Sequence, residues 1–278
     1  MSSEGTGIAW HAPSSYGRTM DIEEFHRTGS TVARALVPRQ ETEALRREFM
    51  ALPAGGRVPG HFEPRPRRPG EDYDPLGEYP RVMNPHEIST AARRMLLDAR
   101  LTTAVAALLG EEPIAAQSMF YFKPPGARGQ ALHQDNFYLR VEPGTCVAAW
   151  LALDRVDRGN GGLEVVPGTH RMDLFCPEEA DPGTYFTREY VPPPPGLERV
   201  PVDMEPGDVL FFNGSLVHGS EPNTTRDRFR RSFICHYAPR STARISRFYR
   251  PLSLDGRDLC LAESAGGGPC GTEVAGPH

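Results

Sequence analysis

The sequence contains only one lysine, Lys123, so arginine supplies almost all of its positive charge. The simplest explanation is a bias in the base composition of the genome. A chain so rich in arginine makes any single arginine weak evidence for a binding site. The net charge is −5, which does not favour binding to nucleic acids or to anionic membranes. A large basic surface is therefore excluded as the basis of function.

Signals for membranes, export and structural cross-links are also missing. No run of about 18 apolar residues occurs, so no transmembrane helix is expected. Residues 1–10 lack the basic and then apolar segments of a secretory leader, which predicts a cytoplasmic protein. The five cysteines are odd in number and include no Cys-x-x-Cys pair. We therefore expect reduced thiols, with neither a disulfide framework nor a zinc knuckle.

The length of 278 residues and the order of the sequence patterns predict one domain, residues 1–278, with a mainly β core. Residues 1–20 are small and polar and predict a loose N-terminal arm. Residues 21–110 predict a helical flank with a long loop. Residues 111–240 contain many short apolar runs separated by turn residues, which is typical of a β-sandwich or barrel. Residues 255–278 predict a glycine-rich tail.

Local patterns place the helices of the flank. DIEEFHRTG predicts a short helix that ends at Gly29, and ETEALRREFMAL predicts a longer one. Residues 87–110 carry the pattern of two successive helices, with a possible cap at Ser89 or Thr90 and a stop at Gly110. In the β region, RGNGG at 158–162 is typical of a hairpin turn.

The residues that carry chemistry begin in ALHQDNFYLR, which predicts a strand that runs into a turn. Residues two apart on a strand face the same side, so His133 and Asp135 project together and Gln134 faces away. His-x-Asp is a weak signal by itself, because a structural histidine beside an aspartate is more common. His218, in GDVLFFNGSLVHGSEPN, is the expected third ligand. Two histidines and a carboxylate that leave one face of a metal open are typical of non-haem Fe(II) oxygenases.

Several further motifs occur in a fixed order: QSMFYFKPPG, HQD, AAWLALD, GNGGLEVVPGTH, EPGDVLFFNGSLVHGSEPN and FRRSFICHY. In this combination, roughly from Phe25 to Tyr237, the chain resembles the phytanoyl-CoA dioxygenase (PhyH) family of Fe(II)/2-oxoglutarate oxygenases. The resemblance implies a double-stranded β-helix, or jelly roll, with flanking helices. It also implies that His133, Asp135 and His218 hold Fe(II), and that 2-oxoglutarate and O₂ occupy its remaining positions.

The resemblance further assigns residues to the cosubstrate 2-oxoglutarate: Arg230, Ser220, Gln117 and Trp150. Arg230 matches the arginine whose planar fork binds the distal carboxylate. The run RDRFRR offers further arginines, for which a solvated basic edge is the simpler interpretation: Arg226, Arg228 and Arg231. The other three residues have ordinary alternatives, namely a turn serine, an exposed amide and a core tryptophan. The histidines within the motifs that match no ligand, His170 and His236, are interpreted as structural.

Substrate residues are harder to assign. Met119 and Tyr121 alternate with Gln117 on one strand face and are expected to line the pocket. Arg81 occupies a place where some relatives carry a basic residue near 2-oxoglutarate, and we group it with the substrate residues. The loops at 53–85 and 171–197 are expected to cover the iron and to set specificity.

These patterns predict an oxygenase that hydroxylates, desaturates, cyclises or epimerises a small molecule at an unactivated C–H bond. The amino-acid composition, nearly without lysine and rich in proline and glycine, fits a high-GC bacterium, in which such enzymes often modify natural products. The alternative is a cupin-like protein that uses the metal triad for non-redox isomerisation or binding, without 2-oxoglutarate. That alternative would have no use for Arg230.

Overall fold

The computed structural model describes residues 20–264 and residue 276. The predicted arm, apart from Met20, and most of the tail lie outside the described residues. The helices are α1 (Ile22–Thr28), α2 (Arg39–Ala51), α3 (Pro75–Glu78), α4 (Thr90–Leu96), α5 (Ala99–Leu109) and α6 (Asn136–Leu139). Three single 3₁₀ turns lie at Leu52–Gly55, Pro85–Glu87 and Thr169–Arg171.

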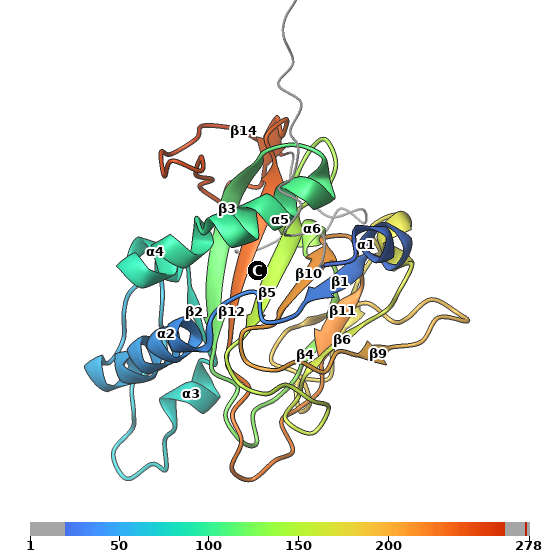
Figure 1. Cartoon of the computed structure of the whole chain (residues 1–278). Coiled ribbons are helices and arrows are strands. Elements are labelled where there is room, and N and C mark those ends of the chain that lie inside the picture. Colours follow the sequence, from blue (N-terminus) through green and yellow to red (C-terminus); the bar gives the residue numbers. More distant parts are fainter. Residues whose placement is uncertain (1–19, 265–275, 277–278) are drawn as a thin grey trace, which may run out of the picture.

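Two antiparallel sheets form the body of the molecule (Figure 1). The larger has the order β1 (Ser30–Ala33), β10 (Val209–Asn213), β5 (Val147–Ala152), β12 (Ser232–Pro239), β3 (Pro113–Tyr121) and β2 (Arg81–Met83). The smaller has the order β4 (Gln130–His133), β11 (His218–Ser220), β6 (Leu163–Val165) and β9 (Val200–Pro201). Two small pairs join β7 (Glu178–Glu179) to β8 (Glu189–Tyr190) and β13 (Arg244–Ile245) to β14 (Ala262–Glu263). The predicted jelly roll with flanking helices is confirmed.

The chain passes between the two sheets more than once, and this corrects one prediction. RGNGG was predicted to be a hairpin turn, but β5 before it belongs to the larger sheet and β6 after it to the smaller. The turn is therefore a crossover. The strands on either side of the turn do not pair with each other: β5 lies between β10 and β12, and β6 lies between β11 and β9.

Both faces of the larger sheet are buried, and successive residues along each strand point to opposite faces. Phe120 of β3 and Phe233 of β12 face the helices, where Phe49 of α2 stacks on Phe120 at 4.7 Å between ring centres. Met119 and Ile234, one residue along each strand, face the smaller sheet instead. Strands covered on both sides read as continuous apolar runs, and all nine residues of β3 are buried. The space between the sheets is where the candidate site lies.

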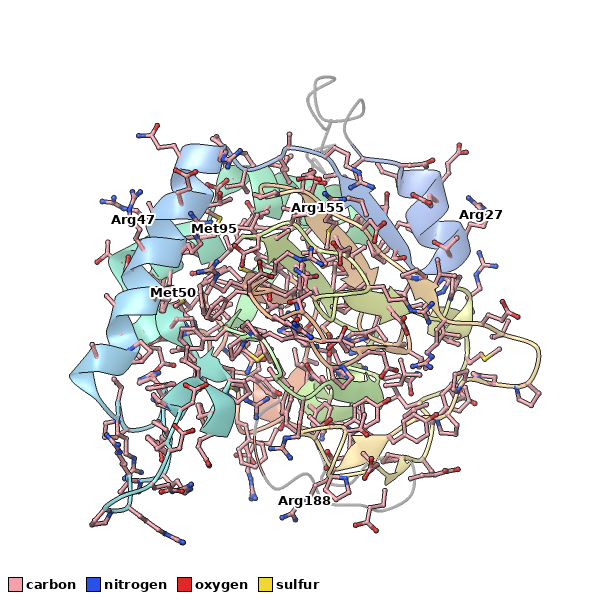
Figure 2. The ribbon with its side chains drawn as sticks, turned by 90° about the horizontal axis from the view of Figure 1, so that it is seen from below. Arg27, Arg47, Met50, Met95, Arg155 and Arg188 are labelled. Carbon is pink, nitrogen blue, oxygen red and sulfur yellow. The ribbon has the colours of Figure 1, made fainter. Side chains whose placement is uncertain are left out.

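The helical flank packs on the outer face of the larger sheet (Figures 1 and 2). Figure 2 shows Arg47 on the outer side of α2 and Met95 of α4 on its inner side, and Met95 is buried in the core. The predicted helix ends are confirmed: Gly29 and Gly110 end α1 and α5 in the left-handed conformation, and Ser89 caps α4. These helices brace the sheet that forms one wall of the pocket.

Two further expectations concern cysteines and membranes. Cys176 forms a disulfide bond, so the expectation of reduced thiols is wrong for this residue, whereas Cys146, Cys235 and Cys260 are free. In the part of the chain that the structure describes, no helix has both the length and the apolar character needed to cross a bilayer.

The turn before β10 requires a glycine. Gly207 has a φ of +97°, and a Cβ atom there would lie 2.3 Å from the carbonyl oxygen of Val37. We expect Gly207→Ala to lower the free energy of unfolding by about 3 kcal/mol or more, since strain and a backbone clash combine. Gly196 also has a positive φ, +84°, but open space around it, so Gly196→Ala should cost about 1 kcal/mol. Denaturant unfolding of both variants checks this, and equal losses would contradict it.

Candidate metal and cosubstrate site

Three predicted ligands meet between the two sheets. His133 is the last residue of β4 and pairs directly with His218, the first residue of β11. The Nε2 atoms of both histidines lie 3.4 Å from Oδ1 of Asp135. Ligands at right angles around one ion, with bonds of about 2.1 Å, would be about 3 Å apart. Among the described residues, these three form the one group of histidine, cysteine and acidic side chains spaced to hold a metal ion.

Asp135 reaches the site by a different route from the one predicted. Strand β4 ends at His133, and Asp135 has helical dihedral angles (φ −60°, ψ −36°) at the start of α6. The carboxylate faces the histidines because the chain turns into this short helix, not because a strand alternates. Gln134 points away, as expected: its amide donates to the carbonyl of Ser215 at 2.7 Å and accepts from the backbone N–H of Phe175 at 2.8 Å.

Hydrogen bonds on the far side of each ring set the histidines up as ligands. Nδ1 of His133 donates to the carbonyl of Ala131 at 2.7 Å, and Nδ1 of His218 donates to the carbonyl of Leu216 at 2.9 Å. Each bond leaves Nε2 as the nitrogen with a lone pair. Burial lowers the pKa of His218 to about 4, so this imidazole is neutral at physiological pH. Neutral imidazoles and a carboxylate are the donors that suit Fe(II).

The carboxylate is held by a residue that the sequence analysis interpreted as structural. Nε2 of His236 on β12 lies 2.9 Å from Oδ2 of Asp135, which leaves Oδ1 directed at the two predicted ligands. Burial by itself raises the pKa of Asp135, but the neighbouring His218 and His236 keep it well below its usual value. The signal that could have found His236 was already present. It alternates with Arg230, Ser232 and Ile234 along FRRSFICHY and so shares their face.

A cavity opens beside the three ligands. Most residues assigned to the cosubstrate or substrate line it, namely Arg230, Ser220, Trp150, Met119 and Tyr121. Apolar side chains from both sheets complete the wall: Leu163, Phe212 and Ile234. Such a mixture of apolar walls and a few convergent polar groups is typical of a small-molecule site.

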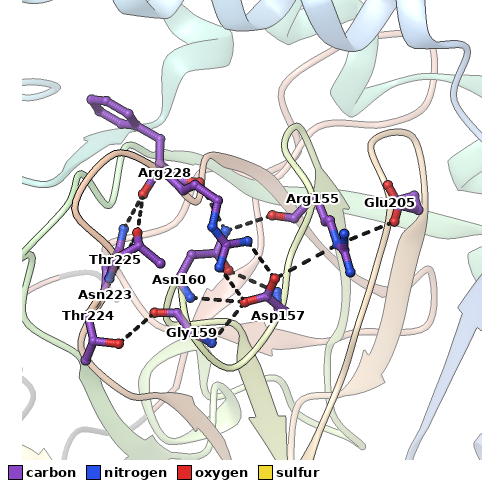
Figure 3. A network of polar contacts seen from close by, with 10 residues as sticks. Arg155, Asp157, Gly159, Asn160, Glu205, Asn223, Thr224, Thr225 and Arg228 are labelled. Carbon is purple, nitrogen blue, oxygen red and sulfur yellow. Dashed lines mark hydrogen bonds and ion pairs between the residues drawn. The ribbon is translucent and has the colours of Figure 1, made fainter.

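The structure separates the arginines that the sequence left open. Arg228 forms a two-pronged ion pair with Asp157, at 2.6 and 2.9 Å (Figure 3). Arg231 does the same with Asp154, at 2.7 and 2.8 Å, and Arg226 is exposed. Arg230 is buried in the cavity wall, and among the described residues no carboxylate lies within ion-pair distance of it.

Neutral partners hold Arg230 in place. Its Nε donates to the carbonyl of Gly161, its Nη1 donates to Oγ of Ser232, each at 3.1 Å, and its guanidinium lies 5.3 Å from the ring centre of Trp150. Burial lowers the pKa of Arg230 to about 10, so it remains charged at neutral pH. A buried cation without a counter-ion is costly, and an anionic ligand in the cavity would offset that cost.

Two predicted residues lie just outside the cavity wall. Gln117 is fully buried, and neither its amide nitrogen nor its amide oxygen has a hydrogen-bond partner among the described residues. It is paired with His236 across β3 and β12, next to the ligand end of the cavity. Arg81 lies behind Tyr121, with Nη1 3.5 Å from the tyrosine hydroxyl and its guanidinium 5.8 Å from the ring centre of Phe186. The roles of both residues stay predictions.

Comparison with known proteins decides the family. The sequence profile described as phytanoyl-CoA dioxygenase (PhyH) matches residues 25–232. The chain belongs to the phytanoyl-CoA dioxygenase family. Phytanoyl-CoA dioxygenase 1 of Oryza sativa subsp. japonica is 33% identical over 143 residues, 50% of this chain and 50% of the rice protein. This chain thus spans about half the length of the curated phytanoyl-CoA dioxygenases that it matches.

Two further proteins match a larger share of this chain. The methylphosphonate hydroxylase of Gimesia maris is 28% identical over 226 residues, 78% of this chain and 79% of that protein. The structure of SnoN, a non-haem alpha-ketoglutarate-dependent epimerase from nogalamycin biosynthesis, is 22% identical. It has a TM-score of 0.63 and covers 83% of this chain and 85% of SnoN, a likeness that concerns the fold.

Proposed function

We propose that the protein is an Fe(II)/2-oxoglutarate-dependent oxygenase that uses O₂ to oxidise an unactivated C–H bond of a small molecule. The observation that carries the proposal is the buried convergence of His133, Asp135 and His218 beside a cavity with one unpaired arginine, Arg230. Membership of the PhyH family supports it. The outcome at the carbon, whether hydroxylation, desaturation, cyclisation or epimerisation, depends on the substrate. The bacterial natural-product setting rests on composition.

Each group in the site has a defined task. His133, Asp135 and His218 would hold Fe(II), which when bound would couple the decarboxylation of 2-oxoglutarate by O₂ to oxidation of the substrate. Arg230 and Ser220 would bind the distal carboxylate of the cosubstrate and so orient its ketoacid end toward the triad. Trp150 and the apolar wall exclude water from the buried charges, which strengthens these contacts.

The test of the proposal uses the purified protein. Without O₂, Fe(II) and 2-oxoglutarate together should give the visible charge-transfer band of a chelated ketoacid. With O₂ and ascorbate, succinate should form. A protein that binds Fe(II) but gives neither band nor succinate would instead fit the cupin-like alternative, a metal-dependent isomerase or binding protein. The unpaired Arg230 counts against that alternative.

The substrate is expected to enter where the two long loops meet. Arg81 begins β2, where the first loop returns to the larger sheet, and Phe186 lies in the second loop. Their side chains are in contact beside Tyr121, which lines the cavity. Among the described residues, no carboxylate forms an ion pair with Arg81; its polar contacts include the hydroxyls of Tyr121 and Tyr79. The relative from Gimesia maris is named for an anionic phosphonate substrate. We infer that an anionic group of the substrate lies near Arg81, with Tyr121 and Met119 along its path.

We expect Arg81→Gln to weaken the binding of an anionic substrate roughly tenfold and to leave the affinity for 2-oxoglutarate unchanged. Methylphosphonate is the first probe, measured by the change in the charge-transfer band and by succinate formation. Arg94, an exposed arginine on helix α4, is the control position for Arg→Gln. A loss of 2-oxoglutarate affinity in Arg81→Gln would instead assign Arg81 to the cosubstrate.

The remaining expectations rest on composition. A cytoplasmic location and the lack of nucleic-acid or membrane partners follow from the charge and from the missing signals, and they stay predictions. The division into one domain with an arm and a tail also stays a prediction.

A further inference from the structure

The one lysine of the chain is buried beside the cosubstrate pocket. Lys123 follows β3, is 3% exposed, and has a positive φ of +35°. Its Nζ donates to Oγ of Ser220 at 2.7 Å and to the carbonyl of Glu221 at 2.6 Å. Among the described residues, no carboxylate pairs with it, because Glu221 directs its carboxylate at Arg199 and Tyr185.

A backbone hydrogen bond holds Lys123 next to Arg230. The backbone N–H of Arg230 donates to the carbonyl of Lys123 at 3.1 Å, and Nε of Arg230 donates to the carbonyl of Gly161. A Cβ atom at Gly161 would lie 2.5 Å from Cε of Lys123 and 2.8 Å from its Nζ. The end of the lysine side chain is thus packed against Gly161, where any larger residue would displace it.

The hydrogen bonds decide which way the hydroxyl of Ser220 can point. A serine hydroxyl has one donor hydrogen and two acceptor positions. Lys123 occupies one acceptor position, and the backbone N–H of Gln130 approaches the oxygen at 3.4 Å. An ammonium group can only donate, so the hydrogen of Ser220 must point away from Lys123. Ser220 lines the cavity together with Arg230, and its hydrogen is therefore available to an anion there.

We propose that Lys123 is a positioning residue for the cosubstrate, which fixes the hydroxyl of Ser220 as a hydrogen-bond donor to the distal carboxylate of 2-oxoglutarate. This rests on the proposed 2-oxoglutarate site at Arg230 and Ser220. Lys123 acts through the serine and need not touch the cosubstrate itself. Burial and the neighbouring Arg230 lower the pKa of Lys123, and an anion bound at Arg230 would favour its ammonium form, which can only donate.

A double-mutant cycle tests the proposal, with 2-oxoglutarate affinity measured from the charge-transfer band without O₂. We expect Lys123→Met and Ser220→Ala each to weaken binding roughly 10-fold or more. Lys123→Met in the Ser220→Ala background should add less than about 3-fold, because its effect passes through the serine. Additive losses, or full affinity in Lys123→Met, would overturn the proposal. The affinity for 2-oxobutyrate, which lacks the distal carboxylate, should be unchanged in these variants. This control shows that the part of the site that holds the metal and the ketoacid group is intact.

A second measurement needs no substitution of the lysine. Because the sequence has one lysine, selective ¹³C-labelling gives a single lysine Cε resonance in the NMR spectrum. With Zn(II) as a diamagnetic substitute for iron, this resonance should move when 2-oxoglutarate is added and stay in place with 2-oxobutyrate. If this resonance does not move when 2-oxoglutarate is added, the proposal is wrong, and this result can be obtained even if the variants fail to fold.

The two levels of failure can be told apart. If the wild type gives no band and Arg230→Met changes nothing, the proposed cosubstrate site is wrong. If the wild type binds and Arg230→Met weakens binding but Lys123→Met does not, the cosubstrate site stands and only the role of Lys123 is rejected.

Discussion

Replacement of His218 by alanine should abolish turnover and weaken Fe(II) binding by more than roughly 100-fold. Loss of a residue that merely orients a metal ligand costs 10- to 100-fold, and loss of a ligand must cost more. His218 supplies one of three donor atoms, its Nε2 has its lone pair directed at the site, and burial keeps the ring neutral. Metal binding is measured by calorimetry with Fe(II) under nitrogen, and turnover by succinate formation.

The control for this experiment is another buried histidine. His86 is 6% exposed, but it lies on the other face of the larger sheet, where its Nδ1 is 2.8 Å from Oγ of Ser118. His86→Ala removes a ring of the same size and should leave the affinity for Fe(II) within about 2-fold, whatever it costs in stability. Equal losses in the two variants would mean that the loss reflects unfolding, and full metal affinity in His218→Ala would reject the triad.

The second large effect is expected at Arg230. Arg230→Met should raise the dissociation constant for 2-oxoglutarate roughly 100-fold, because two charge-assisted hydrogen bonds to a carboxylate together contribute about 3 kcal/mol. Methionine retains much of the apolar volume beside Trp150 while removing the charge. Titration of the charge-transfer band gives the affinity directly.

Its neighbours in sequence provide matched controls. Arg228 and Arg231 already pair with Asp157 and Asp154, so Arg228→Met and Arg231→Met should lose stability and keep the affinity for 2-oxoglutarate. Affinity that falls equally in all three variants would show a general effect of charge. If Arg231→Met lost affinity for 2-oxoglutarate and Arg230→Met kept it, Arg231 would be the arginine that binds the cosubstrate, and the assignment to Arg230 would be wrong.

Several features could be predicted because they depend on patterns short enough to read along the chain. Helices α1, α2, α4 and α5 follow from apolar periodicity, and some of their ends follow from the caps at Ser89, Gly29 and Gly110. Alternation along FRRSFICHY put Arg230 and Arg231 on opposite faces, and the structure agrees. The same alternation held the information on His236, which the sequence analysis interpreted as structural.

Other features depend on which strands pair, and local patterns do not encode this. The RGNGG turn has the composition of a hairpin, yet β5 and β6 pair with different partners, because each buries its apolar face against a different sheet. Likewise, Asp135 was placed correctly for an incorrect reason. Its side chain joins the histidines through the start of α6, while β4 has already ended.

By itself the sequence determined the ligand types, the family and the two-sheet class, since ordered motifs and periodicity are local properties. Tertiary structure decided which arginine of RDRFRR is buried without an acidic partner, because Asp157 and Asp154 reach Arg228 and Arg231 from 71 and 77 residues away. It also decided that Lys123 meets Ser220 across 97 positions of the chain. Such pairings arise from the packing of one sheet on another. Burial makes an unpaired charge costly, so a buried charged side chain without a partner indicates a site for an oppositely charged ligand.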